Sequence, residues 1–154
     1  MTAGTASVPT PHRTEIAVRF REVDSYGVVW HGHYLDWMET ARHAYAAAFG
    51  LDITDFHRRG YRFPMLECRL DYRAAAALGD TIAIDVRLGE EPRRAVAFDY
   101  ALSRAADGRL LARARTVQVV QGEDGGLLLG WPAELEAILG AMRAYQAGLA
   151  APQP

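Results

Sequence analysis

The sequence predicts a single α+β domain in which an antiparallel sheet packs against one long helix. A long amphipathic helical pattern follows one alternating stretch near the N-terminus. The later alternating stretches are separated by hairpin-length turns, which join antiparallel neighbours, because parallel strands need a much longer crossover. A second helical pattern closes the chain, and 154 residues suffice for one domain with a substantial core.

The first predicted strand covers residues 14–23, where apolar and polar side chains alternate as they do in a half-buried strand. A loop over 24–32 leads into a helix predicted over 33–49, whose apolar residues recur every three or four positions. Gly50 then ends this helix. The apolar stripe consists of Tyr34, Trp37, Met38, Ala41, Tyr45, Ala48 and Phe49.

The remaining elements follow from turn signals between alternating runs. A short helix is predicted over 52–59, ending at Gly60, and strands over 61–73, 81–88, 95–104 and 110–121. A short apolar run at 127–129 could add one more strand. Pro132 is predicted at the first position of a terminal helix that runs to about residue 149. The sheet therefore has five to six strands.

Composition excludes several classes of function. Half of the residues are hydrophobic and 23% are charged, as in a soluble globular protein. The net charge of −2 offers no basic surface for nucleic acid, and no apolar run reaches the roughly 18 residues of a membrane span. All seventeen basic residues are arginine, so a single arginine points less strongly to an anion site than usual.

The cysteine content and the N-terminal residues predict the compartment and the domain limits. Cys68 is the only cysteine, which excludes an intrachain disulfide framework and suits a reducing compartment. Residues 1–12 lack the basic and apolar regions of a signal peptide. We therefore expect a disordered tail over 1–12, one domain over 13–150 and a cytoplasmic location.

The loop and the start of the long helix carry a motif. An aspartate is followed, after two residues, by glycine, two valines, an aromatic residue and histidine, and then by a helix with an aromatic residue, glutamate and Ala-Arg. The residues are Asp24, Gly27, Val28, Val29, Trp30, His31, Tyr34, Trp37, Glu39, Ala41 and Arg42. This pattern resembles the signature of the hotdog-fold 4-hydroxybenzoyl-CoA thioesterase family, which includes acyl-CoA thioesterases associated with the Tol-Pal system.

The resemblance spans about residues 14–139 and includes Pro64, Gly79-Asp80 and Arg93-Arg94. It implies a hotdog fold, with the sheet wrapped around the long helix, and hydrolysis of an acyl-CoA to a free acid and CoA without a cofactor or metal. It also implies a homo-oligomer, usually a tetramer, in which sheets of two protomers pair and each active site lies at their interface.

The same resemblance assigns roles to individual residues. Asp24 becomes the nucleophile or the general base, and the backbone N–H groups of His31 and Gly32 bind the thioester oxygen. The His31 side chain polarises the site or assists proton transfer. Further binding residues are Gly27 and Tyr34, with Arg93 and Arg94 at the CoA phosphates.

Each role has a structural alternative. Asp24 could stabilise a turn or cap a helix, the His31 side chain could orient the loop, and Tyr34 could anchor the helix in the sheet. Arg93 and Arg94 could form a solvated hairpin tip. His31 and His33 with a nearby aspartate could also be read as a metal pair, but their spacing sets no third ligand.

The sequence leaves the function open between three readings. Acyl-CoA hydrolysis leads, and an acyl-carrier-protein thioesterase would use the same chemistry with another docking surface. A non-catalytic domain that binds acyl thioesters is the third. Many relatives in this family carry asparagine where His33 stands, so hydrogen bonding around the loop is expected to differ here.

Overall fold

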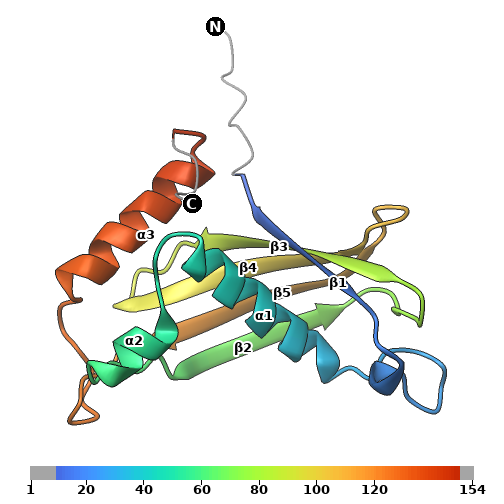
Figure 1. Ribbon diagram of the computed structural model, residues 1–154, viewed down its shortest axis with the longest axis horizontal. Helices are drawn as coiled ribbons and strands as arrows, with labels where there is room; N and C mark the ends of the chain where they lie inside the picture. The colour runs from blue at the N-terminus through green and yellow to red at the C-terminus, as the bar shows by residue number, and fades with distance from the viewer. Residues whose placement is uncertain (1–9, 150–154) are drawn as a thin grey trace, which may run out of the picture.

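The long helix predicted from the sequence lies across one face of an antiparallel sheet (Figure 1). The computed structural model describes residues 10–149. The strands are β1 (His12–Ala17), β2 (Met65–Tyr72), β3 (Thr81–Gly89), β4 (Ala95–Arg104) and β5 (Leu110–Val119). The helices are α1 (His33–Ala47), α2 (Ile53–Arg58) and α3 (Ala133–Gln146), with a short 3-10 turn, η1, at Phe20–Glu22.

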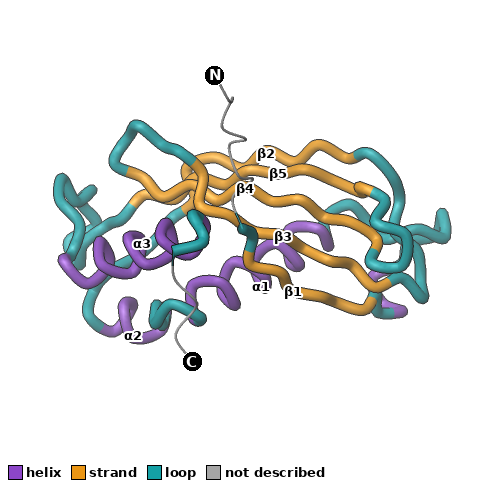
Figure 2. Tube along the Cα trace, turned by 90° about the horizontal axis from the view of Figure 1, so that it is seen from above, coloured by secondary structure: helices purple, strands orange, loops and turns teal. Residues whose placement is uncertain are grey.

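The five strands follow the order β1-β3-β4-β5-β2, and every neighbouring pair is antiparallel. Strands β3, β4 and β5 form a meander, and β1 and β2 are the two edges. Because α1 connects one edge to the other, it must cross the sheet. All three helices lie on the same side of the strands (Figure 2). The predicted α+β architecture and the hotdog arrangement are confirmed.

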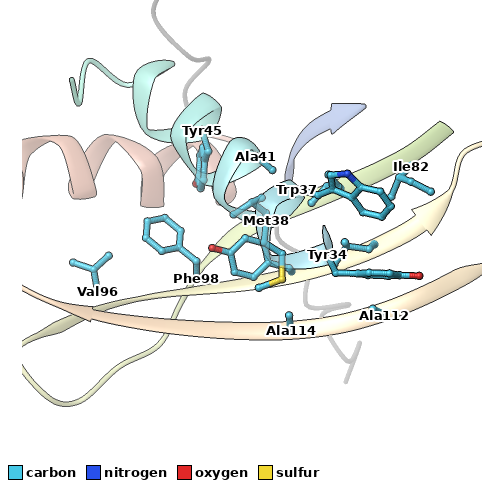
Figure 3. Packing of buried hydrophobic residues seen from close by; sticks show 14 of the residues in the cluster. Tyr34, Trp37, Met38, Ala41, Tyr45, Ile82, Val96, Phe98, Ala112 and Ala114 are labelled. Atoms are coloured by element: carbon cyan, nitrogen blue, oxygen red, sulfur yellow. The ribbon is translucent and has the colours of Figure 1, made fainter. Parts of the chain in front are cut away.

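The core lies between α1 and the sheet, where the predicted apolar stripe is buried from Tyr34 to Tyr45 (Figure 3). Its last two residues, Ala48 and Phe49, follow the end of α1 and are partly buried. Trp37 and Met38 are each 1% exposed, and Tyr45 is fully buried. Burial of a side chain of this size stabilises a fold by roughly 1.5–3 kcal/mol. The positive φ of Gly50 (82°) ends α1, as predicted. Asp52 caps α2 by accepting from the N–H of Thr54 at 2.8 Å.

The first strand is shorter than the sequence predicts. Strand β1 ends at Ala17, and Phe20, expected on the buried face, is 82% exposed. The chain leaves the sheet here because the Glu22 carboxylate accepts the N–H of Arg19 and bends residues 20–22 into η1. The prediction for residues 18–23 was therefore wrong.

Other boundaries differ by a few residues. Strand β2 begins only after Pro64 and carries an irregularity between Met65 and Glu67. Residues 127–129 contribute a single bridge, Gln121 to Leu127, rather than a strand. Helix α3 ends at Gln146, and Pro132 is its N-cap rather than its first residue.

Strand β1 begins at His12, the last residue of the segment expected to form a tail. The His12 ring stacks on Tyr45 at 5.2 Å, and the N–H of Thr10 donates to the carbonyl of Gln146. Residues 1–9 of the expected tail lie outside the described residues. No helix within residues 10–149 is long and apolar enough to cross a bilayer.

Candidate active site

The motif forms a tight loop between η1 and α1, at the end of α1 opposite α2 and α3 (Figure 1). A bridge between Val23 and Val29 closes its base. The N–H of Asp24 donates to the Val28 carbonyl at 2.9 Å, and the N–H of Gly27 donates to the Asp24 carbonyl at 3.0 Å. Gly27 has φ +79°, a conformation that side chains disfavour, so glycine is what allows this turn.

Asp24 lies at the start of this turn and is partly exposed. Its Oδ1 accepts the N–H of Tyr26 at 2.8 Å, which is the turn-stabilising contact that the structural alternative expects. Its Oδ2 has no hydrogen-bond partner among the described residues. The carboxylate is therefore held by one oxygen and presents the other, so a structural and a chemical role are compatible in the same side chain.

Two backbone N–H groups at the start of α1, those of His31 and Gly32, make no hydrogen bond within the part of the chain that the structure describes. Each belongs to a peptide whose carbonyl is held. The Trp30 carbonyl accepts the N–H of His33 at 3.0 Å, and the His31 carbonyl accepts the hydroxyl of Tyr72 at 2.6 Å. Because N–H and C=O point in opposite directions in a trans peptide, fixing the carbonyl also fixes the direction of each free donor.

Only glycine, which has no Cβ, fits at position 32 below the Trp30 ring. A Cβ placed on Gly32 would lie 2.0 Å from Cζ3 of the Trp30 ring. The ring also contacts the His31 and His33 rings, at 4.9 and 5.5 Å between centroids. The Trp30 ring therefore packs against Gly32 and the two histidine rings at the start of α1.

A buried carboxylate, Glu22, supports the loop from below. It is fully buried and accepts hydrogen bonds from the Arg19 N–H (2.7 Å), the Arg19 guanidinium (2.5 and 2.9 Å) and the indole N–H of Trp37 (3.1 Å). Burial raises the pKa of Glu22, but these bonds outweigh it and hold the pKa below its ordinary value. The Glu22 carbonyl also accepts the N–H of Trp30 at 2.9 Å, so the loop is attached to both η1 and α1.

The remaining motif side chains have mainly structural contacts. Tyr34 is 2% exposed, and its hydroxyl accepts the N–H of Ala76 at 3.2 Å, which anchors α1 on the connection before β3. His33 Nδ1 lies 3.0 Å from an Asp36 oxygen. The His31 ring is exposed and meets Tyr72 edge-on. Within residues 10–149 no three metal-ligating side chains come together.

The turn between β3 and β4, which carries Arg93 and Arg94, lies beside the start of β2. Within one chain it is at the end of the sheet opposite the Asp24 loop (Figure 1). Arg93 donates to Glu67 and to Glu91, each at 2.6 Å. The Arg93 hydrogen bonds lower the pKa of Glu91 to about 2. Arg94 has no hydrogen bond or ion pair to any residue that the structure describes. Arg93 is thus paired with two carboxylates, whereas Arg94 has no carboxylate partner among the described residues.

Sequence reasoning missed Glu22 and Tyr72. Glu22 left a signal, because it occupies the next position of the apolar face after Ile16, Val18 and Phe20, where an acid is unexpected. No sequence pattern indicates the role of Tyr72, because its contact with His31 joins residues 41 positions apart. A contact of this kind follows from the tertiary fold alone.

Comparison with known proteins finds a family match and several relatives that are named as thioesterases. The family model described as the thioesterase-like superfamily matches residues 18–139. The chain is 25% identical over 114 residues to the 4-hydroxybenzoyl-CoA thioesterase of Pseudomonas sp., covering 70% of this chain and 81% of that protein. A solved structure from Thermus thermophilus superposes with a TM-score of 0.76 at 32% identity, covering 84% of this chain and 98% of that one.

Two other relatives are more similar to this chain in sequence, but over a shorter stretch of it. YneP from Bacillus subtilis is 32% identical over 72 residues, which is 47% of this chain and 52% of YneP. A Synechocystis protein is 41% identical over 78 residues, or 47% of its length. The chain thus spans about half the length of these two relatives.

Proposed function

Because the chain belongs to the thioesterase-like superfamily, we propose that it hydrolyses an acyl-CoA thioester to a free acid and CoA. The observation that carries this proposal is the pair of free N–H groups at His31 and Gly32, on the same loop as the Asp24 carboxylate. Thioester hydrolysis requires donors for a developing oxyanion and a nucleophile or base beside them. The names of the relatives point to the same class of substrate.

Asp24 supplies the nucleophile or the base through its free oxygen. As a nucleophile, the carboxylate attacks the thioester carbon and expels the CoA thiolate, and water then cleaves the mixed anhydride. As a base, Asp24 takes a proton from the attacking water, and the leaving thiolate is protonated. In both routes the carbonyl oxygen becomes negative, and the His31 and Gly32 N–H groups bind it with help from the dipole of α1.

Other motif residues act around this centre. Gly27 gives the loop its turn, and the His31 ring, which is exposed, assists proton transfer. Tyr34, buried against Ala76, acts by positioning α1 rather than by touching substrate. Tyr72 and Glu22 position the oxyanion donors.

We further propose a homodimer formed through the β2 edge. An edge strand leaves backbone groups unpaired, and β2 exposes Met65, Leu66 and Tyr72 to about half of their area. An antiparallel β2–β2 contact would bring the start of one β2, with Arg93 and Arg94 beside it, near the end of the other, with Tyr72 and His31. Each protomer would then contribute CoA-binding arginines to its partner's site, and two dimers would form the tetramer.

The arrangement of charges favours Arg94 over Arg93 as the first contact for the CoA phosphates, because Arg93 is already paired with two carboxylates. A cytoplasmic location is part of the same proposal. Cys68 is free and exposed, which suits a reducing compartment.

The proposal is tested by release of the CoA thiol from short-chain, long-chain and aromatic acyl-CoAs. Turnover of at least one class, lost in the Asp24→Asn variant, is the expected result. Turnover of acyl-carrier-protein thioesters alone would identify the protein as a carrier-protein thioesterase, and binding without turnover would identify a non-catalytic domain. A Leu66→Glu variant that stays dimeric in light scattering would contradict the β2 interface.

A further inference from the structure

A cavity lies at the end of α1 opposite the Asp24 loop, between the helices and the sheet. It has a volume of about 480 Å³ and is lined by α1, α2, α3, the segment before β2, and strands β4 and β5. This lies within the ~300–1,000 Å³ range of small-molecule sites. No residue of the Asp24 loop lines it. Ten helical residues, or about 15 Å, separate Gly32 from Arg42 at its edge.

The body of the cavity is apolar. Val96 and Phe98 form its floor on β4 (Figure 3), and Leu135, Leu139 and Met142 of α3 form one wall. Such a lining binds a hydrocarbon or aromatic group by removing its apolar surface from water.

Basic side chains surround this apolar body. Arg42, Arg62, His43 and His57 line the cavity, and Glu39 is the one acid that lines it within residues 10–149. Two arginines and one acid leave one excess positive charge when the histidines are neutral. The excess matches a monoanion better than a phosphate monoester with nearly two charges.

The two arginines that line the cavity have neutral hydrogen-bond partners. Arg42 donates to the Tyr100 hydroxyl at 3.4 Å, and Arg62 to the Gly60 carbonyl at 3.5 Å. Neither forms an ion pair with a described carboxylate. Arginines elsewhere do form such pairs, namely Arg13, Arg19, Arg59, Arg69, Arg93, Arg104 and Arg115.

Buried neutral groups hold Arg42 in place. With the Gln118 amide turned so that its nitrogen donates to the Val96 carbonyl, its oxygen accepts from Arg42 at 3.2 Å. Gln118 is 4% exposed and Tyr100 is 3% exposed. Arg42 is thus oriented without being neutralised, and the forked guanidinium can still bind a carboxylate.

We propose that this cavity is a binding site for a carboxylic acid with a medium-sized apolar body, separate from the Asp24 site. The carboxylate pairs with Arg42 and Arg62, and the hydrocarbon or aromatic body fills the space above Val96 and Phe98. The proposal rests on the cavity and its charges, and does not depend on the proposed hydrolysis.

The test is calorimetric titration of the full chain with decanoate, and with decan-1-ol and decylamine as probes that share the apolar body but lack the anion. We expect decanoate to bind at one site per chain and the other two at least about tenfold more weakly, because a charge-assisted bond contributes ~1.5–3 kcal/mol. Equal binding of decanol, or no binding of decanoate, would overturn the proposal.

Substitutions of the residues that line the cavity test where decanoate binds. Arg62→Gln, at an exposed position, and Arg42→Gln should each weaken decanoate binding about tenfold, whereas Arg69→Gln on β2 should not. Loss of binding in Arg69→Gln as well would contradict the assignment. Leu139→Trp should fill the cavity and abolish binding while the circular dichroism stays unchanged.

A competition experiment separates this cavity from the Asp24 site. The Asp24→Asn variant is saturated with a short-chain acyl-CoA and titrated with decanoate. Undiminished decanoate affinity supports an independent site. Competition between the two would assign decanoate to the thioester site and overturn the proposal, whether or not the protein proves to be a hydrolase.

Discussion

The Tyr72 hydroxyl donates a 2.6 Å hydrogen bond to the His31 carbonyl and so links the end of β2 to the start of α1. Partial burial raises the pKa of Tyr72, with further increases from Tyr34 and Cys68, so the hydroxyl stays protonated as the donor. The bond fixes the peptide that carries the free N–H of Gly32.

Tyr72→Phe removes this bond and leaves the ring. We expect kcat to fall about two- to tenfold, the equivalent of ~0.5–1.5 kcal/mol, with little change in KM, because the oxyanion donor is less well oriented. Steady-state kinetics measure this effect. Tyr26→Phe, at an 89% exposed residue of the same loop, is the control, and an equal loss there would remove the role of Tyr72.

Asp24→Asn tests the chemical role directly. We expect kcat to fall by about 10²–10⁴-fold, as for loss of a general base, with the melting temperature preserved because asparagine can still accept from the Tyr26 N–H. Asp124→Asn is a matched control, since Asp124 makes the same kind of contact with the Gly126 N–H at 2.9 Å. Near-normal turnover by Asp24→Asn would refute the mechanism.

Gly32→Ala should disturb the packing of Trp30. The added Cβ meets the indole ring, which is 47% exposed and can move outward, so we expect a loss of only ~1 kcal/mol in unfolding free energy. Activity should also fall, because a backbone shift that makes room for the Cβ changes the direction of the free Gly32 N–H. Gly140→Ala, in α3 with open space at its Cβ, should instead stabilise the protein by up to ~1 kcal/mol. Chemical denaturation and kinetics distinguish the two.

Glu22 makes stability depend on pH in the acid range. Its pKa in the folded protein lies below the ordinary 4.5, so the unfolded chain binds more protons, and the contribution of Glu22 is lost as pH falls through the folded-state pKa. Above about pH 5.5 we expect Glu22→Gln to cost ~1–3 kcal/mol.

The cost of Glu22→Gln should shrink below pH 4.5, the ordinary value. Urea titrations of wild type and variant at several pH values measure the difference. Glu15→Gln, at an exposed position of β1, provides the comparison. A difference that is constant down to pH 3 would show that Glu22 is not a charged acceptor in the native state.

Arg94→Ala should raise KM for acyl-CoA by roughly three- to tenfold, in keeping with loss of a charged contact at an exposed position. A small thioester without the nucleotide should be hydrolysed unchanged. Arg93→Ala should have a smaller effect, because Arg93 is paired with Glu67 and Glu91. Equal KM changes for both substrates would exclude phosphate contact.

The sequence was sufficient for the parts of the fold set by local pattern. The stripe from Tyr34 to Tyr45 is buried as its spacing predicts, and Gly50 and Asp52 end one helix and begin the next. The strand predicted over 14–23 was wrong only at its end, over 18–23, because alternation alone could not show that Glu22 would bind Arg19 and Trp37 rather than continue the ladder.

The sequence could predict which segment carries the candidate site, but not how the residues around it are arranged in space. Asp24, Gly27 and His31 lie on one loop because they are close in sequence. The bond from Tyr72 and the distance between Arg93 and that loop depend on how β2 and the β3–β4 turn are placed in the sheet. No local pattern encodes either of these long-range relationships.

The burial of Glu22 has a consequence for how the protein loses function. Its side chain is bound to Trp37 and its carbonyl to the Trp30 N–H, so the loop cannot detach while α1 stays on the sheet. We therefore expect the loop and the core to belong to one cooperative unit, with amide deuterium exchange at Trp30 as slow as in the middle strands. Hydrolysis and folded structure should then disappear at the same denaturant concentration, with no inactive but folded intermediate between them.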